Sequence, residues 1–406
     1  MKREIRIIEI IFGLVIGLVI ATFVIKKFPP KGTIISPLSK SFSIYAFLTK
    51  HEPPTKTVYG FLPYWSIERA KYLQLDKLTH IAYFGLHIDK DGNFLTQDDE
   101  GFLVPGYNHW KNNEDLHTLI KNAKTSGVKV ALTIVSHNDE ISDQFLDCSS
   151  CWETLADNIL YELKDKEITD INLNFEYVEY TEGDTAQKYS ELTNYLNNTL
   201  DWEFGESEVI VSTFADSLVK PRVTDVKSLS EVADGLFIMA YDFHRPTSDN
   251  AGPVAPIDGI GVHAEYDIKT MLKDYLSIIQ PGKLILGVPY YGYNWVVEED
   301  KEYAQRIEGD EDIGYSQSQT YEGIMETIME VDPTVKWDDL AKSPYFTYIS
   351  PETGSTREVY FENKDSLREK YKLVKQNGLQ GVGIWALGYD AGYTDLWDLL
   401  REEFIN

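Results

Sequence analysis

The chain has 406 residues, and 43% of them are hydrophobic, which is enough to bury the core of one large domain or two medium ones. Asp and Glu total 65 against 38 Lys and Arg, so the formal net charge is −27. This balance disfavours nucleic acids and other strongly anionic polymers as partners, because phosphate contacts need basic patches and like charges repel at long range.

The N-terminus predicts a membrane anchor. Residues 7–25 are apolar apart from Glu9, and a helix over them would span about 28 Å, close to a hydrocarbon core. Lysines follow rather than a small-residue cleavage site, so we expect an uncleaved signal anchor over residues 1–27. By the positive-inside rule, the protein would be a single-pass membrane protein with the rest of the chain on the extracytoplasmic side. Residues 28–55, rich in Pro, Ser and Thr, predict a linker.

From residue 56 onwards, short apolar runs alternate with helical patterns, as in the βαβ units of a parallel sheet. Eight runs predict strands: Thr57–Pro63, Leu78–Leu86, Val128–Val135, Ile168–Glu176, Glu208–Phe214, Gly235–Tyr241, Leu284–Tyr290 and Gly381–Leu387. Helices are predicted over 115–126, 152–165, 184–200, 265–279 and 364–377. The pattern predicts an α/β fold, a (β/α)8 TIM barrel over residues 56–406. A doubly wound open sheet is the alternative, although no phosphate-loop or Gly-x-Gly-x-x-Gly motif supports it.

The stretch between the last two predicted strands, about residues 296–363, is too long for one crossover. It contains two strand-like runs, Tyr345–Ile349 and Glu358–Glu362, and a helical pattern near 320–331. We therefore expect a small α+β insertion between strands 7 and 8, packed beside the barrel mouth.

The fourth predicted strand carries the strongest functional signal. Its side chains alternate, so one face is apolar and the other is polar: Asp170, Asn172, Asn174 and Glu176. Buried polar groups must be satisfied, so an inward polar row has no place in an ordinary core. A row that ends in a carboxylate at the carboxyl end of a strand is typical of an α/β-barrel active site.

This strand resembles the signature of glycoside hydrolase family 18, the chitinase family, whose pattern is Asp-Gly-x-Asp-x-Asp-x-Glu. Glu176 matches the final acid, whereas Asn172 and Asn174 stand where the pattern has aspartates. The resemblance extends over about residues 57–404 and looks closest to the bacterial branch of spore-germination and peptidoglycan-linked hydrolases. Other strand ends resemble the family in the same order: Val58–Trp65, Leu78–Phe84, Met239–Asp242, Gly287–Trp295 and Gly383–Asp390.

The resemblance implies a glycosidase that cleaves β-linked N-acetylglucosamine polysaccharide, of chitin or peptidoglycan type, by a retaining, substrate-assisted mechanism. Glu176 would protonate the leaving oxygen, a role that a raised pKa would suit. The substrate's own N-acetyl carbonyl would attack the anomeric carbon and give an oxazolinium ion. Tyr241 would hydrogen-bond the acetamide oxygen, and Asn174 would stand in for the orienting aspartate.

The resemblance also implies substrate-binding residues. Asp242 would line the same subsite, and Trp385 would stack under the sugar. Weaker candidates for further subsites are Tyr64, Trp65, Asn172, Tyr290 and Trp295. No metal or cofactor is implied, because the sequence has no His-Glu-x-x-His or carboxylate-cage pattern and the chemistry needs none.

Asn174 leaves the function open between three hypotheses. A neutral amide cannot offer a full negative charge to an oxazolinium ion, and such fixed charges lower barriers substantially. The amide could still orient the acetamide, as in the Asn-x-Glu pair of glycoside hydrolase family 85. Otherwise the protein would be a catalytically impaired, lectin-like relative, or a scaffold with no open cleft at Glu176, Tyr241 and Trp385. The run Ser136–Asp139 stands where the family often has Ser-x-Gly-Gly, so its loop is expected to be reshaped.

Cys148 and Cys151 are too few for a four-ligand zinc site. They are expected to form a small loop disulfide outside the cytoplasm, or to remain free thiols inside it.

Overall fold

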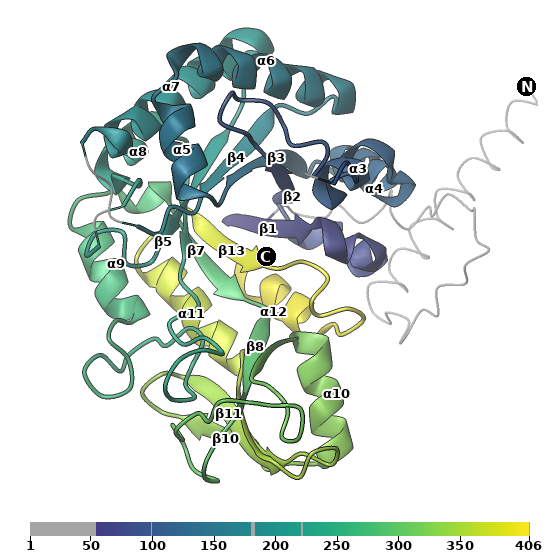
Figure 1. Cartoon of the computed structure of the whole chain (residues 1–406), viewed down its shortest axis with the longest axis vertical. Helices are drawn as coiled ribbons and strands as arrows, with labels where there is room; N and C mark the ends of the chain where they lie inside the picture. Colours follow the sequence, from purple (N-terminus) through teal and green to yellow (C-terminus); the bar gives the residue numbers. More distant parts are fainter. Residues whose placement is uncertain (1–53, 99, 180–182, 221, 406) are drawn as a thin grey trace, which may run out of the picture. The chain divides into compact units, whose positions relative to one another are not determined.

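The computed structural model describes residues 54–98, 100–179, 183–220 and 222–405. Within these ranges eight parallel strands close into a barrel in the order β1-β13-β7-β6-β5-β4-β3-β2 (Figure 1). The closed ring confirms the predicted TIM barrel and excludes the open doubly wound sheet. Its strands are β1 (Thr57–Pro63), β2 (His80–His87), β3 (Lys129–Ser136), β4 (Asp170–Phe175), β5 (Val209–Phe214), β6 (Gly235–Met239), β7 (Leu284–Pro289) and β13 (Gly381–Trp385).

Alternation of side chains along the barrel strands produces two apolar layers. In β1, Val58 and Leu62 point outward into the layer between strands and helices, whereas Tyr59 and Phe61 point into the barrel. β4 departs from this pattern, because its outward side chains are apolar but its inward ones are the buried Asp170, Asn172 and Asn174. The polar row predicted from the sequence therefore lies inside the barrel.

Helices cover the outside of the barrel (Figure 1). They are η1 (Tyr64–Tyr72), η2 (Leu75–Lys77), α3 (Pro105–Asn112), α4 (Glu114–Thr125), α5 (Asp139–Leu146), α6 (Ser149–Lys166), α7 (Thr185–Phe204), α8 (Val226–Val232), α9 (Ile268–Leu276), η3 (Pro281–Lys283), α11 (Lys364–Gln376) and α12 (Asp395–Phe404). Several begin at a residue whose side chain accepts a hydrogen bond from the backbone N–H three residues later, as Asn113 does for α4 and Asp267 for α9. The predicted helices correspond to α4, α6, α7, α9 and α11. Sequence reasoning missed α3, α5, α8 and α12, whose 7 to 10 residues are too few for a clear period.

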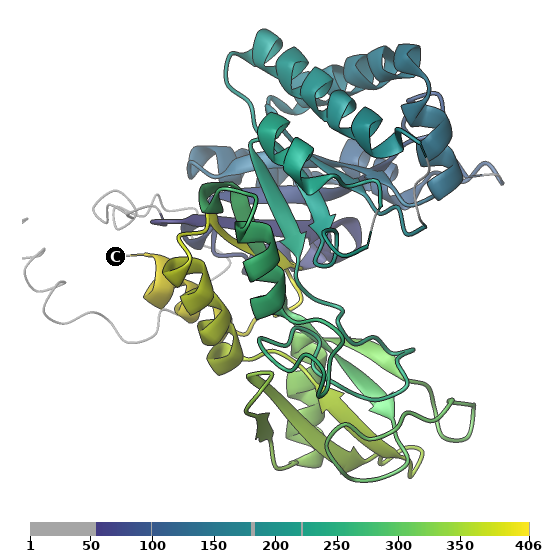
Figure 2. The ribbon, with the colours of Figure 1, turned by 90° about the vertical axis from the view of Figure 1, so that its left-hand side faces the viewer.

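An antiparallel sheet with one helix is inserted between β7 and β13 (Figure 2). Its strand order is β10 (Lys336–Asp338), β11 (Ser343–Ile349), β12 (Thr356–Tyr360), β8 (Tyr291–Val296) and β9 (Gln317–Thr320). α10 (Tyr321–Val331) packs on this sheet through Ile324, which joins a buried cluster with Phe346 and Val359. The insertion begins before the predicted residue 296. β7 ends at Pro289, and Tyr293 on β8 already pairs with Tyr360 on β12.

The predicted localisation is corrected. Within the described ranges no helix is long and apolar enough to cross a membrane. The longest, α6 and α7, carry charged side chains beside a single buried stripe, whereas a span needs about 20 mostly apolar residues. The predicted anchor over residues 1–27, and the linker up to residue 53, lie outside the described residues. A single-pass membrane protein with an extracytoplasmic barrel is therefore not retained.

Cys148 and Cys151 form a disulfide at the start of α6. Of the two alternatives left open by the sequence, the structure therefore has the disulfide rather than two free thiols. Because the two cysteines are 3 positions apart, the bond constrains one local turn rather than distant elements.

Candidate active site

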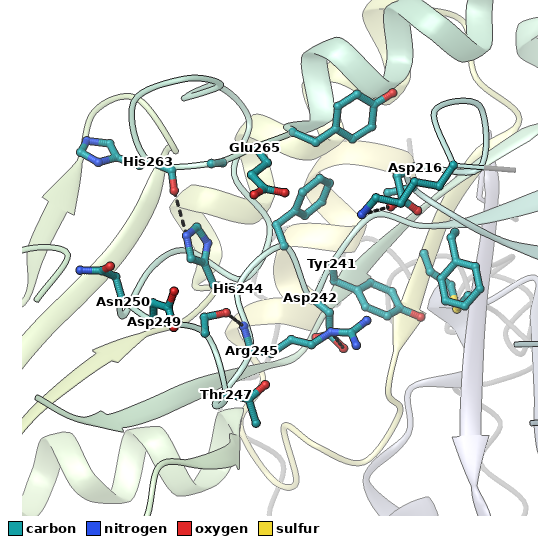
Figure 3. A pocket seen from close by; sticks show the side chains of 18 of the residues that line it. Asp216, Tyr241, Asp242, His244, Arg245, Thr247, Asp249, Asn250, His263 and Glu265 are labelled. Carbon is teal, nitrogen blue, oxygen red and sulfur yellow. Dashed lines mark hydrogen bonds and ion pairs between the residues drawn. The ribbon is translucent and has the colours of Figure 1, made fainter. Parts of the chain in front are cut away.

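Side chains at the carboxyl ends of the barrel strands enclose a cavity of about 170 Å³, here called the inner chamber. A wider cavity of about 810 Å³, the outer groove, adjoins it (Figure 3). The two cavities share Phe214, Met239, Tyr241, Asp242 and Arg245. Together they form one recess at the end of the barrel where TIM-barrel active sites lie. The inner chamber is lined by Phe61, Asn174, Glu176, Ser212, Phe214, Met239, Tyr241, Asp242, Arg245, Tyr291 and Trp385.

Glu176 directly follows β4, and its backbone N–H donates to Ser136 O at the end of β3 (2.9 Å). Its carboxylate Oε1 accepts a hydrogen bond from Asn174 Nδ2 (2.9 Å) and lies 3.2 Å from His137 Nε2. Asn174 Nδ2 is in turn 3.0 Å from His137 Nε2. Three side chains from two neighbouring strand ends therefore form a closed triangle of polar contacts beside the inner chamber.

The environment of Glu176 lowers its pKa. Burial acts to raise the pKa of this carboxyl, but His137, the Asn174 amide and the positive charge of Arg245 together outweigh burial and bring it below its ordinary value. The expectation of a raised pKa is thus not met in the free protein, because His137 and Arg245 come from other loops. Glu176 consequently gives up its proton in acidic solution.

Asp242 connects the barrel to the insertion. It adopts a left-handed backbone conformation with φ 62°, which aspartate tolerates better than most residues. Its Oδ1 accepts hydrogen bonds from Tyr293 OH (2.6 Å) and from Tyr291 OH, both on β8. Arg245 Nε lies 3.9 Å from Oδ2. Asp242 is therefore held by two phenols, with its second oxygen toward Arg245.

Tyr241 lines both the inner chamber and the outer groove. Burial, followed by the negative charges of Glu176 and Asp242, raises the pKa of its hydroxyl well above the ordinary value. Tyr241 therefore stays a neutral hydrogen-bond donor across the physiological pH range.

Aromatic rings form another wall of the recess. The Trp385 ring lies 4.8 Å from Phe84 and 5.6 Å from Phe61, measured between centroids. Trp65 is 6.4 Å from Trp385 and half exposed, and its Nε1 donates to Tyr389 OH (3.1 Å). Such rings offer a stacking surface for the apolar face of a sugar.

The comparison with known proteins agrees with this geometry. A profile described as Glycosyl hydrolases family 18 matches residues 57–390. The chain belongs to this family. It is therefore a glycoside hydrolase of chitinase-like type, as the sequence predicted.

Three similar proteins illustrate the relationship. YdhD of Bacillus subtilis, provisionally described as a sporulation-specific glycosylase, is 25% identical over 329 residues, covering 80% of this chain and 69% of that protein. The cortical fragment-lytic enzyme of Bacillus anthracis is 24% identical over 332 residues, covering 80% and 68%. The crystal structure of the Ostrinia furnacalis group IV chitinase has a TM-score of 0.72 at 19% identity, covering 86% of this chain and 98% of that one. At this low identity, the similarity to the chitinase structure concerns the fold.

The structure brings five predicted residues of this family 18 chain to the inner chamber: Asn174, Glu176, Tyr241, Asp242 and Trp385. Two more lie nearby but do not line it. Trp65 contacts Trp385, and Tyr64 meets the Trp65 ring edge-on at 4.8 Å.

Three predicted substrate-binding residues are not brought to the recess. Asn172 is fully buried inside the barrel, where its amide bonds to Ile210 O (3.1 Å) and to the Ser212 hydroxyl (3.2 Å). Tyr290 is 1% exposed, with its hydroxyl 3.2 Å from Tyr371 OH on α11. Trp295 is buried in the insertion and donates from Nε1 to Arg245 O (3.0 Å), so it supports the loop that carries Arg245.

Sequence reasoning missed His137, Arg245 and Tyr291. His137 lies in the run Ser136–Asp139, which was expected only to differ from the family. Arg245 follows Asp242 by three positions, and Tyr291 lies within Gly287–Trp295, so both were adjacent to recognised motifs. The break between β7 and β8 decides that Tyr291 rather than Tyr290 faces the inner chamber.

Among the described residues, His80, Asp170 and Glu208 form a group with potential metal-ligand atoms. Its carboxylate is already paired, because Glu208 Oε2 lies 2.8 Å from His80 Nε2 and Oε1 lies 2.5 Å from Lys129 Nζ. A lysine cation at that oxygen makes the group an ion-pair network rather than a cation site.

Proposed function

We propose that this family 18 hydrolase cleaves β-linked polysaccharides containing N-acetylglucosamine, by a retaining, substrate-assisted mechanism. The observation that carries the proposal is the convergence of Glu176, Asn174 and Tyr241 on one chamber of about 170 Å³, with Trp385 on its wall. That chamber suits one sugar unit, and the adjoining outer groove suits the continuing chain.

Glu176 is the proposed general acid. It would protonate the leaving glycosidic oxygen as the substrate's acetamide oxygen attacks the anomeric carbon and the glycosidic bond breaks. The resulting carboxylate would then take a proton from the water that opens the oxazolinium ion. This sequence returns Glu176 to its starting state and retains the anomeric configuration.

Asn174 and Tyr241 are proposed to orient the acetamide. Because Asn174 Nδ2 faces Glu176 and His137, its Oδ1 is the atom left to accept the acetamide N–H. The neutral Tyr241 hydroxyl would donate to the acetamide oxygen. Asp242, held by Tyr291 and Tyr293, supplies the nearby negative charge that Asn174 lacks.

Peptidoglycan-type substrates are favoured over chitin by the outer groove. It is lined by side chains of both charges, whereas chitin is neutral. Arg245 lies where the groove meets the inner chamber, and 60% of its side chain is exposed. A guanidinium there could pair with a carboxylate on the sugar chain. The relative from Bacillus anthracis is described as cortical fragment-lytic, which points the same way.

Neither alternative from the sequence gains support. The scaffold hypothesis predicted no open cleft, but Glu176, Tyr241 and Trp385 line one. The lectin hypothesis rested on Asn174, whose amide is engaged with Glu176 rather than turned away from it.

The proposal is tested by incubating the purified protein with oligomers of N-acetylglucosamine and with GlcNAc–MurNAc oligomers, and identifying the products by mass spectrometry. We expect cleavage of at least one series, and a loss of at least 10²-fold in Glu176→Gln, in line with removal of a general acid. Unchanged turnover in Glu176→Gln would exclude Glu176 as the acid. Binding without cleavage of either series would favour the lectin hypothesis.

A further inference from the structure

His137 occupies an unusual position beside the proposed acid. It follows the last residue of β3, and its ring lies 5.4 Å from His87 and 6.1 Å from Phe84. Its Nε2 is 3.2 Å from Glu176 Oε1 and 3.0 Å from Asn174 Nδ2. The imidazole thus contacts both members of the Asn-x-Glu pair from the neighbouring strand end.

The hydrogen atoms available to this triangle restrict its proton states. An amide nitrogen carries two hydrogens and accepts none, so Asn174 Nδ2 can only donate. With Glu176 ionised, the carboxylate accepts from Asn174 and from an Nε2–H of His137. With Glu176 protonated, its hydroxyl can donate to a bare Nε2, which then also accepts from Asn174. The two states differ by one proton moved along the line between Nε2 and Oε1. In the first state the 3.0 Å between Asn174 Nδ2 and His137 Nε2 joins two donors and is no hydrogen bond, whereas in the second state Nε2 accepts there.

The surrounding charges favour the first state in the free protein. On β2, burial followed by the neighbouring His137 lowers the pKa of His87 to about 4, so His87 is neutral above that pH. Beyond β6, Tyr241 is a neutral phenol, Asp242 is engaged by two phenols, and Arg245 adds a positive charge that favours the Glu176 carboxylate. The donors around Glu176 therefore hold it ionised, with His137 as its principal partner.

We infer that His137 is a positioning residue that shares one proton with Glu176, so that the general acid of this enzyme is a carboxyl–imidazole pair. The inference deepens the proposed function and rests on it. In the active form the pair holds one proton, on Nε2 or on Oε1. Transfer to Oε1 leaves a neutral acid and a neutral imidazole, and delivery to the leaving oxygen leaves a carboxylate. The water that opens the oxazolinium ion returns one proton, so the pair is restored.

The inference predicts a specific change in pH dependence. His137→Ala leaves only the Glu176 carboxyl to hold the proton that the pair retains in its active form. Because a pair of bases loses its last proton at a higher pH than either base alone, the basic limb of kcat/KM should move to lower pH in His137→Ala, with kcat lower by roughly ten- to a hundredfold through lost orientation. His137→Gln keeps a donor but no titrating group, so it should recover part of the rate while its basic limb also lies below that of the wild type. His117→Gln, on the outer helix α4, is the matched control and should match the wild type. If the basic limb of kcat/KM lies at the wild-type pH in both His137 variants, the inference is overturned.

A second measurement does not require turnover. The carboxyl carbon of Glu176, identified by its absence in Glu176→Gln, is followed by 13C NMR against pH in the wild type and in His137→Ala. We expect Glu176 to titrate at higher pH in His137→Ala, and identical titrations would refute the shared proton even in an active enzyme. If the titration shifts while the wild type cleaves no oligomer, the pair stands and the proposed function fails.

Discussion

At the scale of single residues, Asn174 decides how the acid works. Its amide donates to Glu176 at 2.9 Å, which stabilises the carboxylate, and it brings no negative charge to the chamber. A carboxylate at position 174 would instead destabilise the Glu176 carboxylate and would bring a negative charge to the chamber. It would repel the Glu176 charge and so raise the pKa of Glu176, and it would stabilise a positively charged oxazolinium ion.

Asn174→Asp should therefore raise kcat near neutral pH by about tenfold, equivalent to about 1.4 kcal/mol of barrier. Its basic limb should also move to higher pH. Initial rates on the cleaved oligomer at several pH values give both quantities. Asn174→Leu, which has similar size but no hydrogen-bonding group, is the control and should lose activity. A slower Asn174→Asp enzyme would show that this site is built for the amide.

At the scale of secondary structure, an ion-pair network ties together the amino ends of four barrel strands. Glu208, just before β5, contacts His80 on β2 (2.8 Å) and Lys129 on β3 (2.5 Å). Its backbone N–H donates to Asp170 at the start of β4 (3.0 Å). The hydrogen bond from His80 outweighs burial and, with Lys129, lowers the pKa of Glu208 to about 2.

Because this pKa is depressed in the folded state, Glu208 stabilises the fold above the ordinary glutamic pKa, and that stability disappears as pH falls toward 2. Glu208→Gln should reduce the free energy of unfolding at pH 7 by about 2 kcal/mol, allowing for partial solvent screening. Urea unfolding between pH 7 and pH 3 should show the wild type and Glu208→Gln converging as the solution becomes acidic. Glu203→Gln, which breaks an ion pair with Lys164 on the outer helices, serves as control. A constant difference across this range would contradict the account.

The barrel strands show which parts of the fold could be predicted from the sequence. Period-two alternation identified β4 and its inward polar row, because strand side chains point to opposite faces regardless of context. The apolar runs located all eight barrel strands within a few residues. The division of Gly287–Trp295 into β7 and β8 was not predictable, since both halves are equally apolar and only pairing with β12 separates them.

The contact between His137 and Glu176 could not be predicted from the sequence either. It depends on the register between β3 and β4, in which Ser136 lies opposite Phe175, so that the next residue of each strand meets at the barrel mouth. A shift of that register would separate the two side chains, and no local sequence pattern indicates which register the two strands adopt. Arg245 reaches the chamber through a loop supported by Trp295, which is also a tertiary effect.

At the scale of the whole molecule, the net charge of −27 opposes approach of an anionic sugar chain. Arg245 offers attraction only over a short distance. Raising ionic strength from about 10 to 150 mM shortens the Debye length from roughly 30 to 8 Å. kcat/KM on carboxylate-bearing GlcNAc–MurNAc oligomers should then rise about two- to threefold, whereas neutral N-acetylglucosamine oligomers should respond little. Equal salt responses would argue against long-range repulsion in substrate capture.

Substrate assistance with Glu176 as the acid is the central claim, and the anomeric configuration of the first product tests it most directly. The purified protein is mixed with the oligomer that it cleaves, and the new reducing end is followed by 1H NMR before mutarotation. We expect the β-anomer first, because attack by the acetamide followed by water inverts the centre twice. An initial α-anomer would mean direct attack by water, and would contradict an oxazolinium route through Asn174 and Tyr241.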